Sequence, residues 1–132
     1  EFGDTIAFIR GLQDAGVATA LITASRNAVP VLGGAGLLDL FEVRVDGIVA
    51  RELDLPGKPA PDVFLEAMRR VGGEIASTAI VEDAVSGVQA GRAGDFALVI
   101  GVNREDAVHG ERLADNGADI VVTSMNQVSV QP

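Results

Sequence analysis

Cysteine is absent from the 132-residue chain, and histidine occurs once, as His109. The absence of cysteine excludes disulfide bonds and thiolate chemistry, and a single histidine excludes a metal site built from several histidines. No apolar run approaches the roughly 18–20 residues that span a bilayer, and no charged-then-apolar leader opens the sequence. We therefore expect a soluble, cytoplasmic protein whose chemistry depends on carboxylates, hydroxyls, lysine, arginine and backbone groups.

Basic residues are few: 10 lysine and arginine residues stand against 19 aspartate and glutamate residues, which gives a net charge of −9. A surface with this balance repels phosphate backbones and anionic lipid, so we expect no nucleic-acid partner and no membrane partner. The apolar content of 48% and the charged content of 22% are typical of a folded domain. The length fits one ordinary domain with a single core.

Helix-like and strand-like apolar patterns alternate along the chain. The segments with helical spacing are 4–15, 27–34, 61–71, 84–93 and 105–116. The short apolar or alternating segments typical of strands are 17–22, 43–46, 78–81, 96–100 and 119–122. Because strands alternate with helices across short connections, we predict one α/β domain with a mainly parallel sheet. We also expect Asp4 to cap the first helix, a loop over 51–60 and a loose end over 124–132.

Ligands of open parallel sheets bind beyond the carboxyl ends of the strands, and three such positions carry polar groups. The first is the run Thr23-Ala24-Ser25-Arg26-Asn27, directly after an apolar strand. Its hydroxyls, guanidinium and helix-start amides can hold a phosphate or another anion. The alternative is an ordinary helix start, in which Ser25 or Asn27 caps the first turn.

The second position is the run Gly57-Lys58-Pro59-Ala60-Pro61-Asp62. A lysine held between turn residues, just before a helix start, can present a point charge to an anion. The alternative is a solvated surface lysine, which is the usual state of a single lysine. The two prolines restrict the backbone on both sides, which makes the solvated alternative somewhat less favoured than for an isolated lysine.

The third position is Glu82-Asp83, two acids at the end of an apolar strand. Such a pair can bind Mg²⁺, which accepts one or two carboxylates together with waters and substrate phosphate. The alternative is that Asp83 caps the next helix while Glu82 points to solvent. We interpret Gly87 and Gly91 as residues that let this helix approach the sheet, because they form no G-x-G-x-x-G fingerprint. His109 we interpret as a surface side chain.

The order of these motifs resembles the haloacid dehalogenase superfamily of phosphotransferases, and more narrowly its β-phosphoglucomutase-like branch. The motifs are a Thr/Ser segment at 23–27, a V-D-G at 45–47, the G-K-P-x-P-D at 57–62 and the E-D-x-x-x-G at 82–87. The resemblance extends over about residues 2–123. It implies a three-layer, Rossmann-like α/β fold with a mainly parallel sheet.

The resemblance also implies roles for the matching residues. Thr23 would hydrogen-bond the transferring phosphoryl group, joined by the backbone amide of Ala24. Lys58 would bridge the phosphate and the nucleophile and stabilise charge in the transition state. Three further residues would help to hold the phosphate or the substrate: Ser25, Arg26 and Asn27.

A magnesium ion is part of what the resemblance implies. Asp83 would bind Mg²⁺, with Glu82 as a second or outer-shell ligand. The parent protein would then be a Mg²⁺-dependent phosphatase or sugar-phosphate mutase, and its substrate a small phosphorylated metabolite such as a sugar phosphate.

One family motif is missing. The nucleophile in that superfamily is the first Asp of an N-terminal D-x-D-G-x-[TS] motif, whereas the only D-G here is Asp46-Gly47, on another strand. The chain therefore resembles the C-terminal part of the core domain, over 1–123, followed by a tail over 124–132. Without the nucleophile, the acid/base and most of the cap, we expect the isolated chain to be inactive. The alternatives are a non-catalytic phosphate-binding or interaction domain and, disfavoured by the absent glycine fingerprint, a Rossmann-type nucleotide binder.

The missing segment has a structural consequence. In the superfamily the first strand is central, between the strands that match 18–22 and 78–81. Its absence would leave two edges with unpaired N–H and C=O groups. We predict that these strands either close up directly or leave a slot filled by a missing N-terminal segment, a second chain, a ligand or water. The resemblance also raises the expectation of a cis Lys58–Pro59 bond and leaves the cis and trans isomers as open alternatives.

Overall fold

The computed structural model describes residues 3–22, 41 and 43–129. The helices are α1 (Gly3–Asp14), α3 (Gly47–Glu52), α4 (Asp62–Arg70), α5 (Val85–Ala93) and α6 (Ala107–Asp115), with short 3₁₀ turns η2 (Ile75–Ser77) and η3 (Met125–Gln127). The strands are β1 (Ala20–Ile22), β2 (Val43–Val45), β3 (Ala79–Glu82), β4 (Leu98–Val102) and β5 (Ile120–Val122). The expected helix over 27–34 lies outside the described residues. Among the described helices, none has the length and apolar character that crossing a membrane requires.

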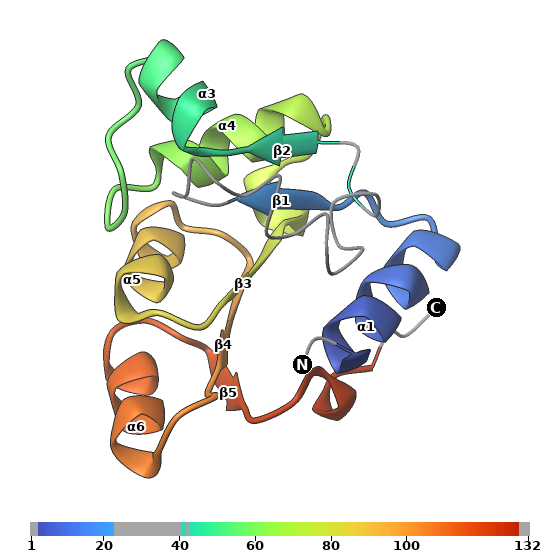
Figure 1. Ribbon diagram of the computed structural model, residues 1–132, viewed down its shortest axis with the longest axis vertical. Helices are drawn as coiled ribbons and strands as arrows, with labels where there is room; N and C mark the ends of the chain where they lie inside the picture. The colour runs from blue at the N-terminus through green and yellow to red at the C-terminus, as the bar shows by residue number, and fades with distance from the viewer. Residues whose placement is uncertain (1–2, 23–40, 42, 130–132) are drawn as a thin grey trace.

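All strand pairs in the described part are parallel, as the alternation of strands and helices predicts. β1 pairs with β2, and β4 pairs with β3 on one side and with β5 on the other. Helices α5 and α6 pack on one face of the β3–β4–β5 sheet, and α1 lies on its other side (Figure 1). Phe8 of α1 packs against the buried cluster that includes Ile100 of β4. The predicted α/β architecture is confirmed.

The described strands form two sheets instead of one. No hydrogen-bonded ladder joins β1 to β3, and no other described strand pairs with both. The side chain of Val81 on β3 is 46% exposed, although a strand inside a parallel sheet is normally covered on both faces. The alternative in which the two strands close up directly is therefore wrong for the described residues. The other alternative, a slot between β1 and β3 filled by a missing N-terminal segment, a second chain, a ligand or water, stays a prediction.

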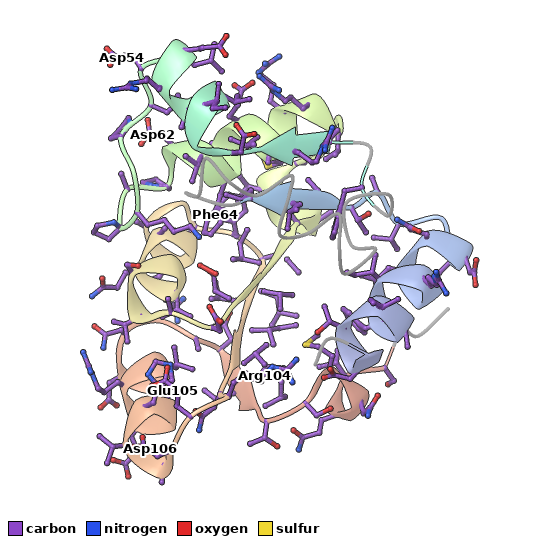
Figure 2. All side chains as sticks on the ribbon, in the orientation of Figure 1. Asp54, Asp62, Phe64, Arg104, Glu105 and Asp106 are labelled. Atoms are coloured by element: carbon purple, nitrogen blue, oxygen red, sulfur yellow. The ribbon has the colours of Figure 1, made fainter. Side chains whose placement is uncertain are left out.

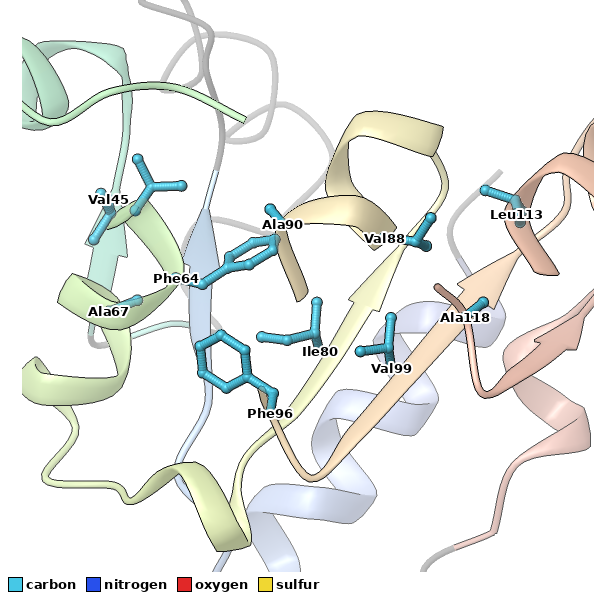
Figure 3. Close-up of a cluster of buried hydrophobic side chains, with 11 residues drawn as sticks. Val45, Phe64, Ala67, Ile80, Val88, Ala90, Phe96, Val99, Leu113 and Ala118 are labelled. Carbon is cyan, nitrogen blue, oxygen red and sulfur yellow. The ribbon is translucent and has the colours of Figure 1, made fainter. Parts of the chain in front are cut away.

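A single apolar cluster joins the two sheets. It contains Val45 of β2, Phe64 of α4, Ile80 of β3 and Val88 of α5, all buried (Figure 3). The Phe64 and Phe96 rings meet edge to face, with their centroids 6.1 Å apart. Helix α4 supplies much of this cluster because its apolar residues recur at helical spacing.

The sequence analysis missed helix α3, which extends into the predicted loop. Asp46 caps this helix by accepting a 2.9 Å hydrogen bond from the backbone N–H of Val49. The helix ends at Glu52, so the loop begins at Leu53 rather than at residue 51. An N-capping aspartate after a strand is a recognisable helix start, but a segment of six residues is too short to show helical periodicity.

The roles expected for Asp4 and for the C-terminal segment are corrected by the structure. Helix α1 begins at Gly3, so Asp4 lies in its first turn instead of capping it. The Asp4 carboxylate accepts a 2.8 Å hydrogen bond from the backbone N–H of Met125 and a 3.1 Å hydrogen bond from the Ser124 hydroxyl. It also pairs with Arg104 at 3.1 Å. Met125 is only 3% exposed, so the expected loose end is wrong for this part of 124–132.

We predict that Asp4→Asn lowers the melting temperature at neutral pH. It should also make the melting temperature less dependent on pH in the acid range where Asp4 titrates. The hydrogen bond from Met125 N–H, helped by Arg104 and Ser124, holds the pKa of Asp4 at about 2. Because the folded-state pKa lies below the unfolded one, this stabilisation is present above about pH 4 and is lost as the pH falls towards 2. Thermal unfolding of both forms between pH 2 and 7 measures the difference. Asp14→Asn, at the exposed far end of α1, is the control. An equal loss in both variants, or an unchanged pH profile for Asp4→Asn, would contradict the prediction.

Candidate active site

Lys58 lies in the loop between α3 and α4, next to a Lys58–Pro59 peptide bond that is cis, one of the two isomers left open by the sequence. Its ammonium Nζ donates a 2.7 Å hydrogen bond to Oε1 of Glu82 and lies 5.2 Å from the centroid of the Phe64 ring. The ring face is electron-rich, so Phe64 attracts the cation from one side while the carboxylate pairs with it. The Lys58 side chain is 20% exposed. The interpretation as a freely solvated lysine is therefore wrong.

Phe64 lies in the predicted helical segment 61–71, and the sequence analysis gave it no part in the site. Phe64 belongs to α4, in the turn that follows Asp62, and its side chain lies between α4 and α5 (Figure 2). The same ring that packs against Phe96 also faces the Lys58 ammonium. The position of Phe64 six residues after Lys58, across the helix start, is the signal in the sequence that the core and the lysine are neighbours.

Glu82 and Asp83 stand at the carboxyl end of β3. The side chain of Glu82 is 13% exposed and forms the ion pair with Lys58, so it does not point to solvent. Asp83 does not cap α5, because the capping position is Ala84, which makes no side-chain hydrogen bond. The alternative in which Asp83 caps the helix and Glu82 points to solvent is thus wrong in both parts. Asp83 is exposed just beyond the strand.

The structure brings together two of the three predicted positions. Lys58 and Glu82 are 24 residues apart in sequence and in direct contact, and Asp83 follows Glu82 along the chain. The third position, the run Thr23-Ala24-Ser25-Arg26-Asn27 that follows β1, lies outside the described residues. Its part in the site stays a prediction.

The donor set at the end of β3 sets a limit on metal binding. Within the described residues there is no group of three or more His, Cys, Asp or Glu that could hold a metal ion. Mg²⁺ does not require such a group, since one or two carboxylates with waters and substrate oxygens complete its coordination. Glu82 and Asp83 meet that minimum. Glu82 is already paired with Lys58, so Asp83 is the carboxylate that is better placed as a direct ligand.

His109 of α6 is a further residue whose environment the sequence analysis misjudged. Its Nε2 lies 2.8 Å from the backbone carbonyl oxygen of Asp83, and its side chain is only 13% exposed. Nε2 also lies 3.4 Å from Oε2 of Glu105, four residues earlier and just before the N-cap of α6. The sequence indicates which face of the helix is buried, because the apolar Leu113 follows four residues later on the same face and is fully buried, but it does not encode the contact with Asp83.

We predict that His109→Ala loosens the backbone after β3 without unfolding the domain. Loss of the contact with the Asp83 carbonyl removes a hydrogen bond worth about 1 kcal/mol, so backbone amides near residue 84 should exchange with solvent roughly five-fold faster. Hydrogen exchange followed by mass spectrometry measures this rate. Val108→Ala, at a 63% exposed neighbour on α6, is the control. If exchange near residue 84 is unchanged, or is equally raised by Val108→Ala, the contact does not hold this backbone.

The sequence of residues 1–95 matches the family model for haloacid dehalogenase-like hydrolases. The chain belongs to this family. Among curated haloacid dehalogenase-like relatives, the beta-phosphoglucomutase of Mycobacterium bovis is 41% identical over 128 residues, which are 96% of this chain and 49% of that protein. The trehalose-phosphate phosphatase of Mycobacterium leprae is 32% identical over 129 residues, which are 96% of this chain and 28% of that protein.

The fold of this haloacid dehalogenase-like chain also matches solved structures. A HAD family hydrolase from Deinococcus radiodurans R1, with bound phosphate and sodium, superposes with a TM-score of 0.80 at 27% identity. The match covers 95% of this chain and 56% of that one. The relationship to the β-phosphoglucomutase-like branch, which the motifs resemble, is confirmed. The chain spans about half the length of the beta-phosphoglucomutases that it matches.

Proposed function

We propose that this chain is the C-terminal part of the core of a Mg²⁺-dependent phosphotransferase that acts on a small phosphorylated metabolite. The observation that carries the proposal is the Lys58–Glu82 ion pair beside Asp83, at the carboxyl end of β3. An ammonium and two carboxylates at this point would supply a positive charge for the phosphate and ligands for a metal ion, which are part of what phosphoryl transfer requires. That reaction depends on positioning and charge neutralisation more than on covalent chemistry by many groups.

Each residue has a specific task in this proposal. Lys58 neutralises charge that develops on the transferring phosphoryl oxygens, while the Phe64 ring and the Glu82 carboxylate fix where its ammonium lies. Asp83, with Glu82 as a second or outer-shell ligand, would hold the magnesium ion, which supplies a positive charge for the phosphate oxygens. Thr23 and the amide of Ala24 bind the phosphoryl group, and three neighbours help to hold the substrate: Ser25, Arg26 and Asn27.

The nucleophile of this reaction is not encoded in the chain, because no D-x-D-G-x-[TS] motif is present. A carboxylate oxygen must attack phosphorus as the bond to the leaving oxygen breaks, and a second group must protonate that oxygen. We therefore expect the isolated chain to be inactive. A segment that carries the motif and a strand, placed between β1 and β3, would supply both groups and pair the two edges.

A sugar phosphate is the substrate class that the relatives favour. Curated relatives are named beta-phosphoglucomutase and trehalose-phosphate phosphatase. Both names describe phosphorylated sugars, so we propose a sugar phosphate as the substrate of this protein, turned over by a mutase or by a phosphatase.

A comparison of the chain alone with the chain joined to an upstream segment bearing D-x-D-G-x-[TS] tests this function. Phosphate release and phosphoryl transfer are measured on a panel of sugar phosphates, with Mg²⁺ and with a chelator. We expect activity from the joined protein in Mg²⁺ only, and none from the chain alone. A joined, folded protein that acts on no sugar phosphate would contradict the proposal.

The absent nucleophile favours one other candidate, a non-catalytic phosphate-binding domain. In that case the chain alone would bind inorganic phosphate or a sugar phosphate, and a protein containing the upstream segment would still show no turnover. Calorimetric titration of the chain with inorganic phosphate, alongside the activity panel, separates the two functions.

A further inference from the structure

Gly87 lies in the first turn of α5 and is buried. A Cβ atom built on this glycine would overlap with Cγ, Cδ and Oε1 of Glu82, which are its three nearest heavy atoms. The Glu82 side chain therefore occupies the space that any other residue at position 87 would fill. This contact is with a functional carboxylate and not with the apolar face of the sheet.

Gly91, four residues later on the same helix, provides the contrast. A Cβ atom there would lie 2.9 Å from Cγ2 of Val99 and 3.5 Å from Cβ of Ile80, which are core side chains of the sheet. The interpretation of both glycines as helix-to-sheet contacts is thus confirmed for Gly91 and incomplete for Gly87. The two glycines lie on one helix face, but each leaves room for a different neighbour.

The carboxylate that lies over Gly87 is the partner of the lysine. Oε1 of Glu82, one of the three atoms that a Cβ would overlap with, accepts the 2.7 Å hydrogen bond from Nζ of Lys58. A side chain at position 87 would force the flexible Glu82 side chain into another conformer and break this pair. Among the residues that the structure describes, the Phe64 ring would then remain as a neighbour for the Lys58 charge.

We infer that Gly87 is a positioning residue: the lack of a side chain there selects the Glu82 conformer that holds the Lys58 ammonium over Phe64. The inference rests on the proposed function only in that Lys58 is the group that meets the phosphate. Gly87 touches no reacting atom and acts through Glu82. The requirement for glycine at this position is steric, since Gly87 needs no unusual backbone angle.

Lys58 is the single lysine of the chain, which makes its environment directly measurable. Lys58 and the N-terminal amine are the primary amines of the protein, so mass spectrometry can follow acetylation of each by an activated ester. The N-terminal amine serves as an internal reference for reagent and pH. An amine held in an ion pair reacts more slowly than a released one.

The test compares Lys58 acetylation in Gly87→Ala, in Glu82→Ala and in the double variant. We expect Gly87→Ala to raise the rate roughly five-fold, the size expected for loss of one partly exposed ion pair. In the Glu82→Ala background, Gly87→Ala should raise it no further, because the conformer that glycine selects no longer exists. Gly87→Ala should still fold, since alanine favours helix and the displaced group is a flexible side chain.

Gly91→Ala is the matched control for a general effect of filling space along α5. It should lower the melting temperature through contact with Val99 while leaving the Lys58 rate unchanged. The inference is overturned if Gly87→Ala leaves the Lys58 acetylation rate unchanged, or if it raises that rate equally in the Glu82→Ala background. It is also overturned if Gly91→Ala raises the rate as much as Gly87→Ala does. No phosphorylated substrate and no metal is used, so this outcome is independent of whether the complete enzyme transfers phosphate.

Discussion

Lys58→Ala is expected to lower phosphoryl transfer by the complete enzyme that we propose roughly 10²- to 10³-fold, the loss that follows removal of one preorganised charge from a transition state. The ammonium contacts Glu82 and the Phe64 ring and has no role in the apolar core, so the fold should be retained. The decrease should appear in kcat more than in KM, because the charge is needed most when the phosphoryl group is in transit. Steady-state kinetics on a sugar phosphate measures both constants.

Two further variants give this prediction its controls. Lys58→Arg keeps the charge but places a planar fork where a compact ammonium fits, so it should restore only part of the activity. Arg70→Ala removes a cation from the C-terminal end of α4, where Arg70 pairs with Glu66 at 2.6 Å, and should leave kcat unchanged. If Lys58→Ala retains full kcat, or if Arg70→Ala lowers kcat equally, Lys58 is not the group that meets the phosphate.

Phe64→Ala destabilises the domain by about 3–5 kcal/mol, as expected when a buried aromatic ring is deleted from a packed core. The ring is buried, contacts Phe96 edge to face, and lies in the cluster that joins the β1–β2 sheet to the β3–β4–β5 sheet. Its loss therefore weakens the packing between the two sheets as well as the packing within one. Urea unfolding followed by circular dichroism measures the change in the free energy of unfolding.

Val108→Ala is the control for this stability measurement. Val108 is 63% exposed on α6, so its truncation should change the free energy of unfolding by no more than about 0.5 kcal/mol. A loss below about 1 kcal/mol for Phe64→Ala would mean that the sheets are held together by other contacts. A changed m-value would show instead that the variant alters the compactness of the native or denatured state, or that the two sheets no longer unfold in one step.

The sequence predicts the elements whose apolar periodicity is long enough to be read. Helices α4 and α5 and all five described strands occur where expected, with ends that differ by a few residues. Helix α3 was missed because its six residues complete fewer than two turns, and its start depends on one capping residue, Asp46. The C-terminal turn was missed because its packing depends on Asp4, at the other end of the chain.

The candidate site was predictable in its residue types and only partly in its contacts. The motif order identified Lys58 and the Glu82-Asp83 pair, since each follows a recognisable turn or strand end. The ion pair between Lys58 and Glu82, however, replaces the solvent exposure that single-residue tendencies favour. Such pairing depends on tertiary distance, as does the contact of His109 with the Asp83 carbonyl. No local pattern encodes either distance.

The hydrogen bond between the Asp4 carboxylate and the Met125 backbone closes a loop of 121 residues. During synthesis, α1 leaves the ribosome long before this partner exists, so it cannot dock in its final place until the last turn has been made. Helix α1 should therefore be among the last segments to become protected as the chain folds, however early its own backbone turns helical.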